Sequence, residues 1–360
     1  MPLPRPVRRL LLPGILAGEA VLLVLFALTA VVGVLTAPVD RHLRLLRLAV
    51  MGASYVCIQW TALAWLLWAW VLRPLRGGDW WDRTNVEVLG WALGAVLWMA
   101  RRTVGLAVEI DAAARPAPFD GQDPVLVLAR HGGIGDSFVL VWMLVTRHHR
   151  RPRVVLKQIL LWEPLIDVTL SRIGACFLPP SRDRPGGDGT ASGPRGRLDA
   201  QVAALAASLV EGDALLLFPE GGNWTPLRRI RAIGRLWASR KPTAARAAVL
   251  MDHVLPPRAG GVLACLDSRP EIPVAIVAHT GLDRITTAGQ MWDAVPFDVP
   301  MSLRWWPAAS PPYGREERVE WLTTEWAVVD QWIDSRSGVV DDPPADVPPG
   351  SGSPLSGSGR

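Results

Sequence analysis

A histidine and an aspartate stand five positions apart in the segment VLVLARHGGIGDSF, where a run of apolar residues ends. An imidazole that takes a proton from an alcohol needs a carboxylate partner to fix its tautomer and stabilise the imidazolium ion. Gly132, Gly133 and Gly135 permit a sharp turn that could bring the side chains of His131 and Asp136 together. The spacing indicates general base chemistry on a hydroxyl group; the alternative is that Asp136 only caps a helix.

A second polar cluster follows the apolar run LLLF, where Phe218 is followed by Pro219, Glu220, Gly221 and Gly222. A carboxylate beside two glycines at the carboxyl end of a strand lies where α/β sheets bind ligands. Glu220 could therefore hydrogen-bond a substrate hydroxyl or orient other polar groups. The alternative is a solvated acidic residue in a Pro-Gly turn.

The elements that must position these residues alternate between short apolar runs and helical patterns. This alternation predicts an α/β fold with a mostly parallel central sheet flanked by helices. The expected strands are 125–129, 154–156, 214–218 and 272–278, and the expected helices are 137–147, 160–173, 198–210 and 318–333. We expect this domain to span residues 104–334, with a flexible Gly/Pro/Ser insertion at 184–197 and a disordered tail at 335–360.

The composition places part of the chain in lipid. Of 360 residues, 50% are hydrophobic and 20% are charged, and the mean hydropathy is +0.22, which is too apolar for an ordinary soluble enzyme. Residues 1–103 are expected to anchor the chain through apolar segments near 10–39 and 48–72, with an interfacial helix near 86–100. Arginines flank both apolar segments, so their distribution favours neither orientation, and spanning and monotopic anchors both stay open.

The charged and metal-binding residue types exclude several classes of function. All but two of the 38 basic residues are arginines, which suit an anionic lipid surface, and they form no recognisable nucleic-acid module. The three cysteines show no CxxC spacing, and no His-x3-His or Cys-His spacing joins the histidines. We therefore expect no metal, no cofactor and no nucleic-acid partner.

Together, the His-x4-Asp and Phe-Pro-Glu-Gly segments resemble the two diagnostic blocks of the glycerophospholipid acyltransferase superfamily, which includes 1-acylglycerol-3-phosphate acyltransferases. Between them, residues similar to the family's second block follow in order: Lys157, Pro164, Gly174, Phe177 and Arg182. IPVAIVAHT looks like the fourth block. FPEGGNWT and the later VLPPRAGG look most like the lysocardiolipin and lysophosphatidylinositol acyltransferase branch. Gly222 and Asn223 depart from that branch, as do the glycines of the first block.

The resemblance implies a membrane-bound O-acyltransferase that moves an acyl chain from acyl-CoA or an acyl-carrier protein to a glycerol hydroxyl of a lysophospholipid, at the cytoplasmic face. His131 would act as general base, oriented by Asp136. The substrate would be bound by Phe218, Pro219, Glu220 and Gly221, and its phosphate by Arg182, Lys157 or Arg258. Two alternatives stay open: acylation of a glycolipid or other membrane alcohol, and a catalytically inactive lipid-binding scaffold.

Overall fold

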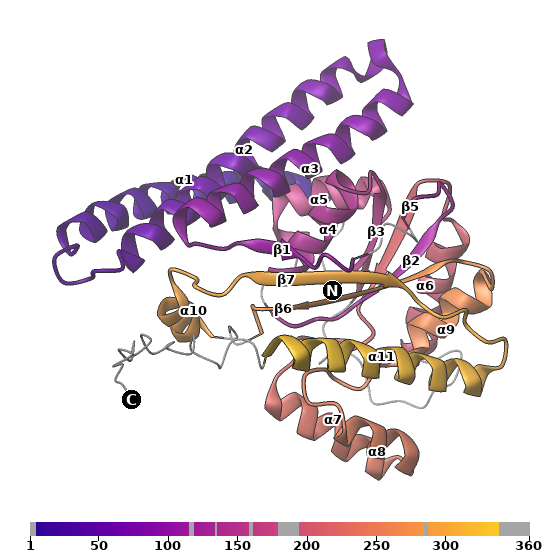
Figure 1. Ribbon diagram of the computed structural model, residues 1–360. Coiled ribbons are helices and arrows are strands. Elements are labelled where there is room, and N and C mark those ends of the chain that lie inside the picture. Colours follow the sequence, from indigo (N-terminus) through magenta and orange to yellow (C-terminus); the bar gives the residue numbers. More distant parts are fainter. Residues whose placement is uncertain are drawn as a thin grey trace, which may run out of the picture.

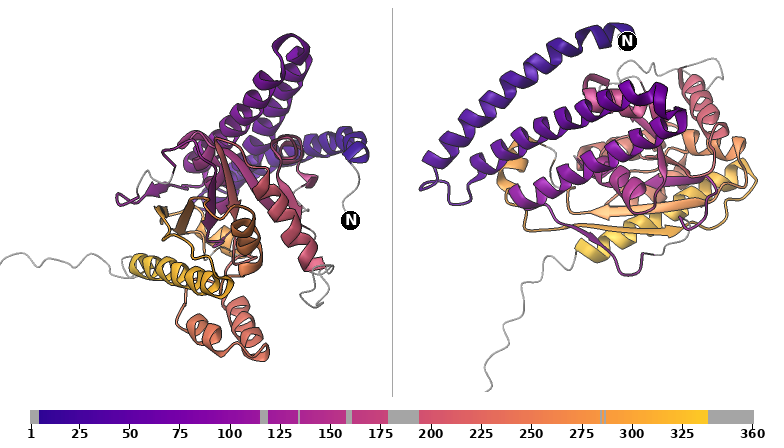
Figure 2. Two further views of the ribbon diagram at one scale, coloured as in Figure 1. Left: turned by 90° about the vertical axis from the view of Figure 1, so that its right-hand side faces the viewer. Right: turned by 90° about the horizontal axis from the view of Figure 1, so that it is seen from above.

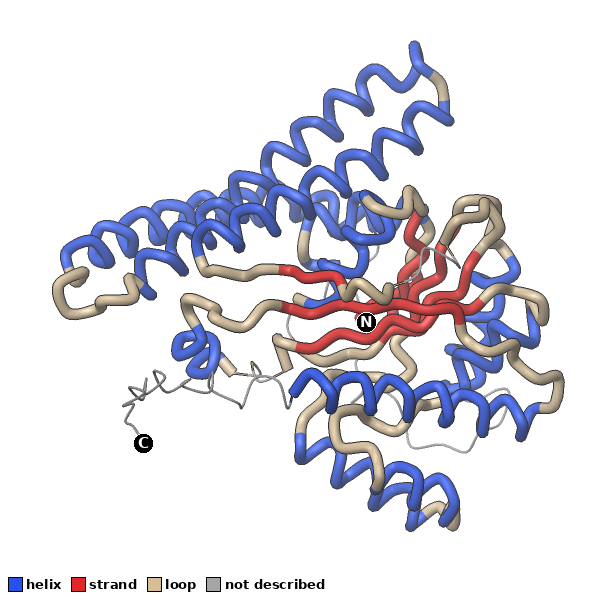
Figure 3. Tube along the Cα trace, in the orientation of Figure 1, coloured by secondary structure: helices blue, strands red, loops and turns tan. Residues whose placement is uncertain are grey.

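The computed structural model describes residues 5–114, 119–133, 135–157, 161–178, 194–283, 285 and 287–337. A seven-stranded sheet with strand order β1-β7-β6-β2-β5-β3-β4 forms the centre (Figures 1 and 3). Its strands are β1 (Val108–Ile110), β2 (Val125–Ala129), β3 (Arg151–Lys157), β4 (Cys176–Leu178), β5 (Asp213–Leu217), β6 (Val274–Thr280) and β7 (Met301–Pro307). All neighbouring strands are parallel except β6 and β7, which are antiparallel.

Helices cover both faces of this sheet. One face packs against α3 (Gly78–Thr103), α4 (Asp136–Thr146) and α5 (Pro164–Ile173). The other packs against α6 (Pro194–Ala207), α7 (Pro226–Ala238), α8 (Pro242–Val249), α9 (Ala259–Ser268) and α11 (Arg315–Ser337). Strands β2 and β5 are buried along their whole length because helices cover them on both sides. The predicted α/β class with a mostly parallel sheet is confirmed.

Two long apolar helices precede this domain: α1 (Arg5–Leu35) and α2 (Arg44–Arg76). Residues Leu10–Leu35 of α1 and all of α2 are long and apolar enough to cross a membrane. The Glu19 carboxylate joins the two helices by accepting hydrogen bonds from Gln59 Nε2 at 2.6 Å and Trp60 Nε1 at 2.7 Å. Arg8 joins α1 to the α/β domain through a bidentate ion pair with Asp167, at 2.8 and 3.0 Å.

The structure corrects several predicted boundaries. α1 starts before residue 10 and ends at Leu35, α2 extends beyond 48–72 at both ends, and α3 is longer than 86–100. The predicted insertion is wrong at its end, because Pro194 begins helix α6, a position where proline is tolerated. The rest of the insertion, 184–193, lies outside the described residues. Likewise, α11 continues to Ser337, and only the part of the tail after that residue lies outside them.

The sequence patterns did not reveal three strands (β1, β4 and β7), helices α7–α9, or α10 (Ala288–Ala294). β1 and β4 have three residues each, too few for a periodic pattern. In β7, alternate residues are buried, as expected for a strand next to the sheet edge. Its antiparallel pairing with β6 is decided by contacts between distant segments.

Candidate active site

The predicted site residues follow the carboxyl ends of parallel strands. β2 and β5 are hydrogen-bonded neighbours, with Val127 opposite Leu216 and Leu128 opposite Leu217. The two strands end in register, so the loops that carry His131 and Glu220 leave the same edge of the sheet side by side. β3 pairs with β5 on the other side, which brings the end of β3 at Lys157 to this edge as well. Ligands of α/β sheets bind at such an edge.

His131 and Asp136 are in direct contact. The His131 Nδ1 atom lies 2.9 Å from Asp136 Oδ2. Since a carboxylate can only accept, the proton is on Nδ1, and Nε2 is left as a proton acceptor. The His131 side chain is 15% exposed, whereas that of Asp136 is 1% exposed. The pair therefore has a buried orienting carboxylate and a base that solvent or substrate can reach.

Asp136 is the first residue of α4 and is held as a carboxylate by four donors. Besides His131 Nδ1, it accepts hydrogen bonds from the backbone N–H groups of Gly133 at 3.3 Å and Ser137 at 2.6 Å, and from the Ser137 hydroxyl at 3.1 Å. Burial alone raises the pKa of Asp136. The hydrogen bond from His131, the nearby His279 and the backbone donor outweigh that effect and lower the pKa to about 2. Asp136 thus orients the histidine in addition to starting the helix.

The glycines of the loop are required by close packing as well as by the turn. A Cβ atom on Gly133 would collide with the carbonyl oxygen of Leu282, and one on Gly132 would lie 2.5 Å from Asp283 Oδ1. Gly135 has a φ of +91°, in the left-handed region that favours glycine. The loop can therefore pass directly over the segment that follows β6.

Glu220 is buried beneath this loop, so the solvated-turn alternative is wrong. Its Oε1 accepts a hydrogen bond from the His131 backbone N–H at 3.4 Å, and its Oε2 accepts one from Leu255 N–H at 3.3 Å. Trp224 N–H in turn donates to the His131 carbonyl at 2.8 Å. Burial raises the pKa of Glu220 to about 8, although Arg130 and the two backbone donors favour the charged form. Both oxygens contact backbone, so Glu220 fixes the position of His131.

The remaining predicted residues are arranged around the same loop. The Phe218 ring lies 4.8 Å from the His131 ring, centroid to centroid. Pro219 accepts a hydrogen bond from Arg258 N–H at 2.8 Å. Gly221 has a φ of +69°, and the Arg258 guanidinium lies 3.1 Å from where its Cβ would be. Arg258 therefore packs beside the Phe-Pro-Glu-Gly loop.

The side chains of two predicted phosphate-binding residues are not among those that the structure describes. Lys157 ends β3 at the correct edge, opposite Leu178 of β4, but its side chain is not among the described ones. Arg182 is outside the described residues. Their assignment to the substrate phosphate stays a prediction.

Two buried residues complete the site and were not identified from the sequence. His279 in β6 is fully buried, with Nε2 at 2.9 Å from the Arg130 carbonyl and at 3.6 Å from Asp136 Oδ2. Arg130 is also buried; its Nη1 donates to the His279 carbonyl at 2.9 Å and lies 2.6 Å from Asp283 Oδ1. Burial lowers the pKa of His279, so it is a neutral imidazole whose Nε2–H points to Arg130. A charged residue ending an apolar run was the one signal for Arg130.

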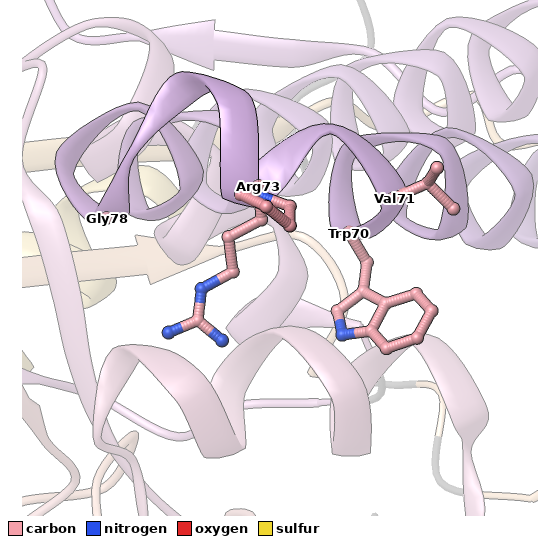
Figure 4. Close-up of a pocket in the computed structure, with 5 residues that line it drawn as sticks. Trp70, Val71, Arg73 and Gly78 are labelled. Carbon is pink, nitrogen blue, oxygen red and sulfur yellow. The ribbon is translucent and has the colours of Figure 1, made fainter.

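In the described part of the chain, no three or more His, Cys, Asp or Glu side chains form a cluster that could hold a metal. A hollow of about 540 Å³ lies near the α2–α3 junction, where Trp70 and Arg73 project in the same direction (Figure 4). It is lined by Trp70, Val71, Arg73, Pro74 and Gly78, none of which belongs to the His131 site.

The structure is an α/β domain with a histidine-aspartate pair at the carboxyl edge of its sheet. Residues 108–277 match the sequence model of the acyltransferase family. This match confirms the resemblance to glycerophospholipid acyltransferases and the predicted class of enzyme, an O-acyltransferase.

Among solved structures, the chain is similar to the crystal structure of the 1-acyl-sn-glycerophosphate (LPA) acyltransferase PlsC from Thermotoga maritima. It covers 78% of this chain and 98% of that chain, with 12% sequence identity and a TM-score of 0.45. No curated protein shows significant sequence similarity to the chain.

Proposed function

We propose that this protein transfers an acyl chain from acyl-CoA to a glycerol hydroxyl of a lysophospholipid, such as 1-acylglycerol-3-phosphate, in phospholipid synthesis or remodelling. The observation that carries the proposal is the contact between His131 and the buried Asp136 inside an acyltransferase-family domain. Helices α1 and α2 support a lipid acceptor because they can hold this domain at a bilayer, where such substrates reside.

The reaction needs one base and no covalent enzyme intermediate. His131 Nε2 accepts the proton of the acceptor hydroxyl as its oxygen attacks the thioester carbonyl carbon. The C–O bond formed in this attack is kept as the new ester bond. The tetrahedral intermediate then collapses, its C–S bond breaks, and the thiolate of CoA leaves. The thiolate takes the proton from the His131 imidazolium, which restores the neutral base.

The imidazolium that forms during this step is stabilised by Asp136. Its pKa of about 2 keeps Asp136 negatively charged across the physiological range. His279 donates its Nε2–H to the Arg130 carbonyl and lies 3.6 Å from the Asp136 carboxylate, so it limits the positions that Asp136 can adopt. These contacts pre-organise the pair before the substrate arrives.

The acceptor's phosphate would be bound by basic residues at the same edge of the sheet. Arg258 is the described candidate because it packs beside Gly221, next to the loop that carries Glu220. Lys157 and Arg182 are further candidates from the sequence resemblance. An arginine fork matches phosphate oxygens through two charge-assisted hydrogen bonds.

Acyl transfer by membranes that contain the full chain tests this function. Radiolabelled acyl-CoA is offered with a panel of lysophospholipids and glycolipid alcohols, and the products are separated by head group. We expect a labelled diacyl phospholipid with the wild type and none with His131→Ala. A product formed only from a glycolipid would assign the acceptor to that class. No product with any acceptor, from folded protein, would contradict the proposed activity and favour a lipid-binding scaffold.

A further inference from the structure

The α7–α8 hairpin is strongly basic. Between Asn223 and Met251 the chain has seven Arg and Lys residues and no Asp or Glu. The exposed ones among them are Arg228, Arg231, Arg235, Arg240, Lys241 and Arg246. This segment alone exceeds the net charge of +5 of the whole chain.

α7 presents three different faces. Ala232, Ile233 and Leu236 point to the domain core. A second face exposes large apolar side chains, with Leu227 at 56% and Ile230 at 64%, followed by Trp237.

The third face of α7 is formed by arginines three and four positions apart: Arg228, Arg231 and Arg235. Val249 and Leu250, at the end of α8, are also exposed. The hairpin therefore exposes an apolar stripe bordered by positive charge, which we call the α7–α8 surface. Stripes of this composition mark sites where another molecule binds.

This surface is directly connected to the catalytic histidine. Trp224, immediately before the Thr225 cap of α7, donates its N–H to the His131 carbonyl at 2.8 Å. Arg228 bonds the Asn223 carbonyl through Nη1 at 2.9 Å and lies beside Gly222. A molecule bound along α7 would therefore meet the catalytic loop at the start of this helix.

The α7–α8 surface does not face the same way as the apolar N-terminal helices. Figure 1 and the left view of Figure 2 show α2 and α3 above the sheet and α7–α8 below it. The packing agrees, because α3 and α7–α8 contribute to the cores on opposite faces of the sheet. A bilayer that contacts the domain on the side of α2 and α3 therefore lies across the sheet from α7–α8. This placement favours a soluble acidic partner over the membrane.

We propose that the α7–α8 surface docks an acidic acyl-carrier protein as a donor in addition to acyl-CoA, and that the carrier delivers its acyl thioester to His131. The inference rests on the proposed acyl transfer and adds a protein-bound donor to it. Acidic side chains of the carrier pair with Arg231 and Arg235, while an apolar part of its surface covers Leu227 and Ile230. The carrier's thioester arm then enters the site past the Trp224 end of α7.

The test compares two donors in the detergent-solubilised full chain. The variant Arg231→Glu/Arg235→Glu reverses two charges that are not part of the catalytic site. We expect its kcat/KM with acyl-carrier protein to fall about tenfold or more, and its kcat/KM with acyl-CoA to stay within about twofold of the wild type. Added salt should weaken the wild type with the carrier and have little effect on the variant.

The matched control is Arg83→Glu/Arg315→Glu, which makes the same change in net charge at exposed positions on α3 and α11. It should leave use of the carrier unchanged. Binding of a fluorescently labelled carrier is measured in parallel by anisotropy, which does not depend on catalysis. If the wild type uses neither donor, the proposed function fails, and the binding measurement still decides the docking.

Three results would overturn the proposal. Equal losses with both donors would assign the two arginines to the catalytic site or the fold. Unchanged carrier binding in the α7 variant would exclude the surface as the docking site. Weaker binding of the variant to phosphatidylglycerol vesicles, with normal use of the carrier, would assign the surface to anionic lipid.

Discussion

Replacing Asp136 by asparagine tests the central contact of the site with little change in side-chain shape. The Asp136 carboxylate accepts four hydrogen bonds, two on each oxygen, and all four partners are donors. An amide in either orientation turns its NH2 group toward two of these donors. If that group faces His131, it favours the tautomer with the proton on Nε2. In this tautomer Nε2 cannot accept the proton of the substrate hydroxyl.

The expected losses of activity and stability in Asp136→Asn follow from these contacts. A hydrogen bond to a charged group is worth about 1.5–3 kcal/mol, and the stabilisation of the imidazolium is lost in addition. A total of about 3–5 kcal/mol of transition-state stabilisation corresponds to a decrease in kcat of about 10²- to 10⁴-fold. Protein stability should fall by about 1–3 kcal/mol, since buried donors lose their acceptor.

Initial rates of acyl transfer in detergent-solubilised protein measure the effect, and circular dichroism with thermal unfolding confirms that the variant is folded. The double variant Asp136→Asn/His131→Ala is the control. Because the two side chains act as one unit, it should be no less active than His131→Ala alone. A folded Asp136→Asn protein that keeps more than a third of the wild-type kcat would refute the assignment of Asp136 as the orienting carboxylate.

The other predictions concern the buried residues around this pair. His279→Leu should lower kcat about tenfold with little change in KM, because the N–H group at 3.6 Å from Asp136 is lost. His279→Gln keeps a hydrogen-bond donor and should recover much of the rate. Equal rates of the two variants in a steady-state assay would contradict this positioning role. For Glu220, a pKa raised from 4.5 to about 8 means that its contribution to stability is present below pH 4.5 and is lost as the pH rises toward 8. In the wild type this loss lowers the unfolding free energy by roughly 5 kcal/mol over that range, and Glu220→Gln should abolish it, which gives a flatter plot of Tm against pH. An unchanged plot would show that Glu220 is not the titrating group.

Short-range features of the site could be predicted from the sequence. His131 and Asp136 are five residues apart, and the glycines between them allow one turn of chain to bring them into contact at 2.9 Å. Strand β2 was predicted with the bounds that the structure has, because an apolar run of five residues between polar segments has one common interpretation in an α/β chain.

The contacts that support the pair could not be predicted in this way. His279 is 143 positions from Asp136, and the sequence shows only a histidine near the end of an apolar run. Its role follows from the pairing of β6 with β2, in which Ala129 is opposite Val277. Glu220 could be assigned to the same edge of the sheet, but its burial and its bond to the His131 backbone depend on the loops that cover it.

The sequence by itself therefore determined the class of fold, the two apolar N-terminal helices and the residues that we propose for the chemistry. These properties depend on periodicity and spacing over a few residues, where the backbone geometry restricts what side chains can reach. The tertiary structure decided which strands are neighbours, which polar groups are buried and which face of α7 stays exposed. Those properties arise from packing between segments far apart in the chain, and no local pattern specifies them.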